Sequence, residues 1–326
     1  MTERGSPLKY RLLVTRRLPA PVEARLSTHF DAKLNADDTP FSPENLIAEA
    51  SGFDGLLVTP ADKITAALIN ALPASIRIIA TFSVGFDHID LAAAKARGII
   101  VTNTPDVLTD ATADIALLLM LGAARGASWG ERMVREAQWS SWSPTKPLGL
   151  DVSGKRLGIL GMGRIGQATA KRARAFGMQI HYFSRKPVAS EDALGAIYHE
   201  TPLALAPHSD FLSIHCASTP ETRGLVNAEL LARLPKPAVL VNTARGDIVD
   251  DDALITALTA GTLAAAGLDV YRNEPNIDPR YRTLTNAFLL PHLGSATRDT
   301  RIAMGMRAAD NLEAFFGGKE PGDRLC

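Results

Sequence analysis

Three glycines within residues 161–166 have the spacing of a dinucleotide-binding turn. The segment reads GMGRIG, follows the apolar run Leu157–Leu160, and precedes a helix-like stretch that ends at Gly177. A strand, a tight glycine turn and a helix let the backbone approach a pyrophosphate and point a helix N-terminus at it. The pattern alone also occurs in ordinary strand-to-helix turns, but its flanks favour a dinucleotide site. The residues predicted to bind there are Gly161, Gly163, Arg164, Ile165 and Gly166.

The residues about twenty positions further on indicate which dinucleotide binds. In an NAD site an acidic residue stands there and holds the ribose 2′-hydroxyl group. Here the second strand ends in Ser184, Arg185 and Lys186, and the next acidic residue is Glu191. Arginine forms charge-assisted hydrogen bonds with a phosphate, whereas a carboxylate would repel it. The sequence predicts a preference for NADP(H), with NAD(H) still possible; the alternative interpretation of these residues is a solvated surface turn.

Three later segments each place a charged or titratable residue just after an apolar strand. They are residues 241–247, 267–275 and 291–297, and all three belong to the same half of the chain. In a doubly wound sheet, ligands bind where the carboxyl ends of the strands meet. A single histidine, Arg-Gly pair or Glu-Pro pair is more often structural. Their joint occurrence at three successive strand ends favours a catalytic site.

Length and composition exclude several classes of protein. The chain has 326 residues, enough for about two domains, and 35 basic residues balance 35 acidic ones. This balance argues against a nucleic-acid-binding or polybasic membrane protein. Cys216 and Cys326 have no metal-site spacing and fit a reduced compartment. Without a signal-peptide pattern or a membrane-length apolar run, we expect a cytoplasmic protein with no metal centre, nucleic-acid partner or membrane span.

The pattern of elements predicts an α/β fold with two Rossmann-like domains. Strands alternate with helices, which indicates parallel sheets with helices on their faces. In the first hundred residues we expect strands at 10–15, 55–59, 76–81 and 98–102, and helices at 21–30, 43–50, 61–72 and 90–97. After the glycine turn we expect strands at 157–160, 179–183, 211–215, 238–242, 264–270 and 287–290.

Two long helices define the expected domain boundaries. The helix predicted over 106–125 is apolar nearly all round, which favours burial between domains or subunits. The helix over 300–316 is expected to cross back to the first domain. The predicted domains are therefore a substrate domain, 1–105 plus 300–326, and a dinucleotide-binding domain, 106–299, with the active site in the cleft between them.

The motifs together resemble the D-2-hydroxyacid dehydrogenase family. The sequence VGFDHID at 84–90 and the three late segments carry the resemblance. Within the family, FSVGFDHID, GMGRIG, FSRK and PHLGSAT are most similar to glyoxylate/hydroxypyruvate reductases. The similarity covers nearly the whole chain. It implies a flavodoxin-like substrate domain, a homodimer, and reduction of a small 2-oxo acid to the 2-hydroxy acid, such as glyoxylate to glycolate or hydroxypyruvate to D-glycerate.

The resemblance implies a catalytic triad of Arg245, Glu274 and His292. An imidazolium is a suitable proton donor near neutral pH, so His292 would protonate the carbonyl oxygen. Glu274 would orient the ring and favour its protonated form. Arg245 would bind the substrate carboxylate and polarise the carbonyl group. Backbone amides of the loop containing Val84 and Gly85 would hold the other carboxylate oxygen.

Further residues follow from the resemblance alone. Thr109 and Gly294 would contact the cofactor, Asp269 would lie near the nicotinamide amide, and Cys216 and Thr243 would line the cofactor groove. Burial at strand ends explains these residues nearly as well. Two tryptophans, Trp139 and Trp142, would either reach a partner subunit's substrate site or pack at an interface.

Two other functions stay open at this point. One is a phosphoglycerate or D-lactate type dehydrogenase on the same scaffold, which would usually prefer NAD. The other is a dinucleotide-sensing co-repressor, which binds peptide motifs and which a complete triad does not exclude. Comparing NADPH with NADH on several 2-oxo acids separates the three.

Overall fold

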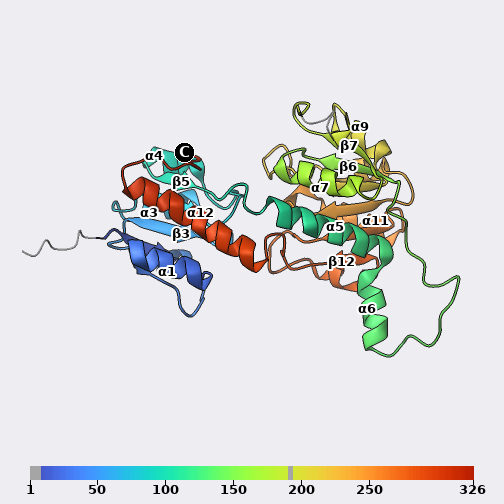
Figure 1. Ribbon diagram of the computed structural model, residues 1–326, viewed down its shortest axis with the longest axis horizontal. Helices are drawn as coiled ribbons and strands as arrows, with labels where there is room; N and C mark the ends of the chain where they lie inside the picture. Colours follow the sequence, from blue (N-terminus) through green and yellow to red (C-terminus); the bar gives the residue numbers. More distant parts are fainter. Residues whose placement is uncertain (1–8, 190–193) are drawn as a thin grey trace, which may run out of the picture. The chain divides into compact units, whose positions relative to one another are not determined.

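The computed structural model describes residues 9–189 and 194–326, which form two compact α/β units (Figure 1). The first unit combines Met1–Leu108 with Thr297–Cys326, and the second is the continuous segment Thr109–Ala296. Each unit contains its own all-parallel sheet. The α/β prediction is confirmed.

Among the described residues, the sheet of the first unit has five parallel strands in the order β2-β1-β3-β4-β5. This is the order of flavodoxin-like sheets. Its central strands are buried on both faces, as expected when helices cover a parallel sheet. The edge strand β2, with the sequence DAK, has no apolar run that could have predicted it. The strands are β1 (Arg11–Val14), β2 (Asp31–Lys33), β3 (Gly55–Val58), β4 (Ile78–Thr81) and β5 (Ile100–Thr102).

The first unit carries helices on both faces of its sheet. Helices α2, α3 and α4 contribute to one apolar core, while α12 lies beside α1 (Figure 1). The expected helix over 61–72 is wrong at its start: Ile64 bridges to Ile89, and Thr65 caps the helix by accepting from Leu68 N. The helices are α1 (Ala20–His29), α2 (Pro43–Glu49), α3 (Ala66–Ala71), α4 (Leu91–Ala96) and α12 (Arg298–Phe316).

The described part of the second unit has seven parallel strands in the order β12-β11-β10-β9-β6-β7-β8. The chain adds β7 and β8 on one side of β6 and then returns to add β9 to β12 on the other side. Doubly wound sheets bind ligands at this switch point between β6 and β9. Six strands match the predicted ones, and the three-residue edge strand β8 is additional. They are β6 (Arg156–Leu160), β7 (Gln179–Phe183), β8 (Ala196–Tyr198), β9 (Phe211–Ile214), β10 (Val239–Asn242), β11 (Ala265–Leu268) and β12 (Ala287–Leu289).

Helices cover both faces of this second sheet. The apolar helix α5 packs beside α7 in one core, and α10 and α11 belong to the other. In the described part of the chain, no single helix is long and apolar enough to cross a membrane; α5 and α6 pass that test only as a pair bent by 68°. The helices are α5 (Thr109–Arg125), α6 (Ala127–Arg135), α7 (Arg164–Arg174), α9 (Pro202–Leu205), α10 (Ala228–Ala232) and α11 (Asp251–Thr259), with short 3₁₀ turns η1 (Ala206–His208), η2 (Gly246–Ile248) and η3 (Pro279–Thr283).

Candidate active site

The glycine turn connects β6 to α7 at the switch point of the second sheet. Gly161 has φ of +99°, and a Cβ there would come within 2.5 Å of the Cys216 backbone nitrogen. A Cβ on Gly166 would lie 2.2 Å from the Gly161 carbonyl oxygen. These two positions therefore require glycine for the tight turn and for close packing of the helix on the strand.

The middle of the turn is open and fits a pyrophosphate. A Cβ on Gly163 would meet no atom within 4 Å. Gly163 is also the N-cap residue of α7, and no side chain caps this eleven-residue helix. Its first amide groups consequently face outward with the positive end of the helix dipole, where an anion is stabilised. Arg164 and Ile165, the first two residues of α7, occupy this rim.

The basic trio follows the end of β7, the strand next to the glycine turn. Gly161 N donates to Phe183 O at 2.9 Å, which joins the turn to the strand end just before Ser184. Arg185 and Lys186 are exposed, and the Ser184 hydroxyl donates to the Lys186 carbonyl oxygen. Two exposed cationic side chains therefore follow the strand end that is hydrogen-bonded to the glycine turn.

His292 and Glu274 form a hydrogen-bonded pair at the carboxyl end of the sheet. His292 Nδ1 lies 2.6 Å from Glu274 Oε2. An ionised carboxylate only accepts, so Nδ1 carries the hydrogen and Nε2 is left for proton exchange. Burial raises the pKa of Glu274, but the hydrogen bond and charge of His292 outweigh it and leave the pKa below its usual value. The carboxylate also accepts from Tyr271 N at 2.7 Å, which fixes its orientation.

Asp269 is fully buried and holds the backbone that carries His292. Its carbonyl oxygen accepts from His292 N at 2.8 Å. Its carboxylate oxygens accept from Leu293 N at 2.6 Å and from Gly294 N at 2.7 Å. Burial raises the pKa of this carboxyl group despite those bonds. Asp269 thus fixes the backbone of residues 292–294 through three hydrogen bonds. The sequence does not indicate this role.

Arg245 projects from the turn after β10. The buried Asn242 shapes that turn, because its side chain donates to Arg245 O at 2.9 Å and accepts from Ala244 N at 3.0 Å. The charge of Arg245 also lowers the pKa of Glu274. This is the smallest of the effects on that pKa, and burial, the largest, raises it. Arg245 and the His292–Glu274 pair therefore share one electrostatic environment. Sequence reasoning missed Asn242, although its place at a strand end was a usable signal.

The remaining residues assigned to the cofactor lie at four places in the second unit. Thr109 is the first residue of α5, and Gly294 accepts through its carbonyl oxygen from the Thr112 hydroxyl at 3.1 Å. Cys216 follows β9 against the glycine turn, and burial raises its thiol pKa to about 11. Thr243 follows β10, with its hydroxyl 3.4 Å from Nδ1 of His215.

His215 is a further site residue that sequence reasoning missed. It directly follows β9, and its backbone N–H donates to Leu160 O at 2.7 Å beside the glycine turn. Its Nε2 lies 2.8 Å from the Ser213 hydroxyl oxygen. Burial lowers the pKa of His215 to about 4, so the ring is neutral near pH 7. A neutral imidazole bonded on both sides is a fixed part of the groove wall.

The predicted carboxylate-binding loop belongs to the first unit and follows β4. Its Ser83 hydroxyl donates to Gly85 O at 2.6 Å and lies 2.8 Å from the Thr81 hydroxyl. Ser83 O in turn accepts from Thr104 N at 2.9 Å. These bonds fold the chain at Val84 and Gly85 into a compact turn.

An apolar hollow of about 300 Å³ adjoins the histidine. His292 and Glu274 stand on its wall. The rest of the lining is mainly apolar: Tyr271, Pro275, Ile277, Leu289, Leu290 and Pro291.

The described residues contain no group of three His, Cys, Asp or Glu side chains that could hold a metal ion. The arrangement instead combines an anion-binding helix end, an oriented imidazole and an arginine. Such a set can bind a dinucleotide and move a proton to or from a carbonyl oxygen.

Comparison with known proteins agrees with this geometry. Residues 117–294 match the model of the D-isomer specific 2-hydroxyacid dehydrogenase NAD-binding domain. The chain is 44% identical over 314 residues to a glycerate dehydrogenase of Hyphomicrobium methylovorum, covering 96% of this chain and 98% of that protein. It is 43% identical over 319 residues to a glyoxylate reductase of Korarchaeum cryptofilum, covering 96% and 95%.

A solved structure extends the similarity to three dimensions. The NADPH-dependent glyoxylate/hydroxypyruvate reductase of Sinorhizobium meliloti, in complex with NADP and malonate, matches with a TM-score of 0.87 and 37% identity. The match covers 98% of this chain and 97% of that one. With its glycine turn, its histidine–glutamate pair and these relatives, the chain belongs to the D-isomer specific 2-hydroxyacid dehydrogenase family.

Proposed function

We propose that the protein reduces a small 2-oxo acid to the corresponding 2-hydroxy acid with NADPH, glyoxylate and hydroxypyruvate being the best substrates. The observation that carries the proposal is the 2.6 Å contact between His292 and Glu274 in the same unit as an open, uncapped glycine turn. It places an oriented proton donor and a dinucleotide-binding turn on one sheet. The similar proteins named glyoxylate reductase and glycerate dehydrogenase support the same substrate class.

The residues divide the reaction between binding and proton transfer. The bound dinucleotide would supply a hydride to the substrate carbonyl carbon. His292 would donate the Nε2 proton to the carbonyl oxygen, because Nδ1 is occupied by Glu274. The ionised Glu274 stabilises the imidazolium before transfer and keeps the ring in one tautomer afterwards. In the reverse direction the neutral ring would accept the alcohol proton.

Two groups are proposed to hold the substrate carboxylate. The guanidinium of Arg245 would bind it and polarise the neighbouring carbonyl group. Backbone amides at Val84 and Gly85 would hold its second oxygen, as the family resemblance implies. Under this proposal the first unit is the substrate domain and the second is the dinucleotide-binding domain.

The preference for NADP(H) rests on the end of β7. Ser184, Arg185 and Lys186 offer a hydroxyl group and two cations at the position where an NAD site carries an acid. The similar reductase from Sinorhizobium meliloti is named NADPH-dependent, and its structure was solved with NADP. NAD(H) remains a usable but weaker cofactor under this proposal.

Steady-state kinetics test the proposal directly. The purified protein is assayed with NADPH and with NADH on glyoxylate, hydroxypyruvate, pyruvate and 2-oxoglutarate. We expect the highest kcat/KM for NADPH with one of the first two acids. Turnover only with NADH would overturn the cofactor preference. No turnover of any acid by a protein that binds NADPH would instead favour a dinucleotide-sensing role.

We also propose that the protein is a cytoplasmic homodimer. The segment 136–149 after α6 projects from the second unit (Figure 1) and exposes 60% of Trp139, 78% of Trp142 and 75% of Leu148. Such large apolar groups in one segment are typical of a protein interface. Both thiols, Cys216 and Cys326, are free, as in a reduced compartment.

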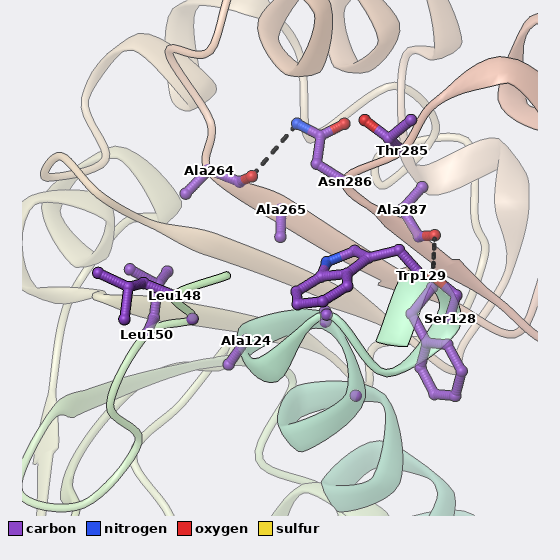
Figure 2. A pocket seen from close by; sticks show the side chains of 15 residues that line it. Ala124, Ser128, Trp129, Leu148, Leu150, Ala264, Ala265, Thr285, Asn286 and Ala287 are labelled. Carbon is purple, nitrogen blue, oxygen red and sulfur yellow. Dashed lines mark hydrogen bonds between the residues drawn. The ribbon is translucent and has the colours of Figure 1, made fainter. Parts of the chain in front are cut away.

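A hollow of about 490 Å³ at the start of β11 and β12 adjoins the base of this segment. Figure 2 shows the indole of Trp129 within it, with Leu148 and Leu150 at one side and Ala265 and Ala287 from the two strands. Because the strands are parallel, this hollow lies at the amino ends of the strands, whereas His292 follows the carboxyl end of β12. Dimerisation here would leave the catalytic edge accessible, and sedimentation at micromolar concentration would measure it.

A further inference from the structure

The loop proposed to bind the substrate carboxylate is held from behind by one asparagine. Asn103 follows β5, and its side chain donates to the Val84 carbonyl oxygen at 2.8 Å. Asn103 is 8% exposed, so water does not readily replace this bond. The orientation of the Val84 peptide group therefore depends on where Asn103 stands.

Asn103 is in turn fixed by residues more than two hundred positions away in the sequence. Its backbone carbonyl oxygen accepts from Asn311 Nδ2 at 3.1 Å, and its backbone N–H donates to the Asp323 carbonyl oxygen at 3.3 Å. Asn311 lies on α12 and is 2% exposed. The same amide group donates to Asp323 Oδ2 at 2.9 Å, and its oxygen accepts from Asp323 N at 3.2 Å.

Asp323 is anchored by a two-pronged ion pair. Arg307 Nε and Nη2 donate to its two carboxylate oxygens at 2.6 and 2.8 Å. The Asp323 side chain is 5% exposed, whereas Arg307 is 40% exposed. The segment also pairs with β5, through Leu325 N donating to Val101 O at 2.8 Å. All these groups belong to the first unit, so the chain of bonds from Arg307 to Val84 is continuous within one compact body.

We propose that Asn103, Asn311 and Asp323 are positioning residues that set the substrate-carboxylate loop, with Arg307 holding Asp323 in place. The proposal rests on the proposed function of the 83–85 loop. None of the four need touch the substrate. If one of these side chains is removed, its buried hydrogen-bond partner is left unsatisfied. The 83–85 loop must then move or lose order.

The expected effect falls on the binding of the 2-oxo acid. A misplaced loop weakens substrate and transition state alike, so KM rises while kcat changes little. Coupled members of one network commonly interact strongly enough to change an equilibrium about fivefold or more. The KM for NADPH should stay nearly constant, because the glycine turn lies in the other unit.

Two variants with the same chemical change test this inference. Arg307→Met removes the anchor of Asp323. Arg25→Met removes an arginine that bonds Glu313 and Asp310 on the same helix, at 2.8 Å each, but whose hydrogen bonds do not reach Asn103, Asn311 or Asp323. We expect Arg307→Met to raise KM for glyoxylate at least about fivefold and to weaken oxamate binding to the NADPH-loaded enzyme similarly. Arg25→Met should lower thermal stability and leave both values unchanged.

Conservative substitutions separate positioning from general stability. Asp323→Asn keeps one of the two acceptor oxygens and nearly the same side-chain volume, so it should retain a lower KM than Asp323→Ala. Asn311→Ala should reproduce the Arg307→Met effect. Unchanged KM and oxamate affinity in Arg307→Met, or equal rises in Arg25→Met, would overturn the inference while leaving the proposed function standing. A wild-type protein that neither reduces glyoxylate nor binds oxamate would overturn both.

Discussion

At the scale of single residues, His292 is held in an unusual backbone conformation. Its φ is +56°, which non-glycine residues adopt only when the surroundings enforce it, at a cost of about 1–3 kcal/mol. Asp269 supplies the enforcement through three bonds to residues 292–294. The imidazole is therefore positioned from two sides, by Asp269 through the backbone and by Glu274 through the ring.

Substituting His292 tests the proton donor. His292→Gln keeps a hydrogen-bonding side chain but cannot donate a proton at neutral pH. We expect kcat for glyoxylate reduction to fall by about 10²-fold or more, in the range for losing a general acid. NADPH affinity, followed by fluorescence titration, should be preserved, and near-normal turnover in this variant would refute the assignment.

Arg185 tests the choice of dinucleotide. A charge-assisted hydrogen bond contributes about 1.5–3 kcal/mol, so Arg185→Ala should raise KM for NADPH about tenfold or more and leave KM for NADH nearly unchanged. Arg174→Ala is the matched control, because Arg174 is an exposed arginine at the far end of α7. Equal losses with both cofactors would argue that Arg185 contacts no 2′-phosphate.

At the scale of elements, three histidines join β7 to the edge of the second sheet. His181 Nδ1 lies 3.0 Å from His199 Nε2, and the His208 ring stacks on both. Burial, and then the charges of His199 and His208, lower the pKa of His181 to about 4. Burial and His208 also lower the pKa of His199. Arg156, paired with Asp210, adds a further positive charge nearby.

This cluster predicts acid sensitivity of folding. Below an unfolded pKa of about 6.5 the unfolded chain binds a proton that folded His181 does not, so stability falls as pH drops from about 6.5 to about 4. His181→Gln should flatten the fall of the urea midpoint across this window. His29→Gln, at a half-exposed histidine on α1, serves as the control. A wild-type slope in His181→Gln would contradict the prediction.

Burial decides which strands and helices could be predicted from the sequence. Buried strands such as β3 and β10 were predictable, because each contains three consecutive apolar residues between turn signals. The edge strands β2 and β8 were not, since each has three residues and is partly exposed. Helix α6 was missed as well, because it is short and none of its residues is buried, although its apolar and charged residues lie on different faces. The sequence showed that Arg245, Glu274 and His292 follow strand ends, and the family resemblance implied their roles. Asn103 and Asn311 gave no signal, since their contact is set by tertiary packing.

At the scale of the whole molecule, the two units differ in how the chain builds them. The second unit is one continuous segment with two apolar cores of its own. We expect the fragment 109–296 to fold alone and bind NADPH, giving a cooperative thermal transition that shifts upward with ligand. Saturation at a hundred times Kd should add about 2.7 kcal/mol of stability. A fragment with no cooperative transition would show that the unit depends on the rest of the chain.

The first unit depends on both flanks of the second. Helix α12 packs beside α1, and Asp323 reaches Asn103, so residues before and after the second unit complete one sheet layer and one hydrogen-bond network. During synthesis, the bonds that hold Asn103 behind the 83–85 loop therefore cannot form until residue 323 has left the ribosome. The dinucleotide-binding turn can form earlier. Under the proposed role of the 83–85 loop, a nascent chain would hold cofactor before it could bind an acid.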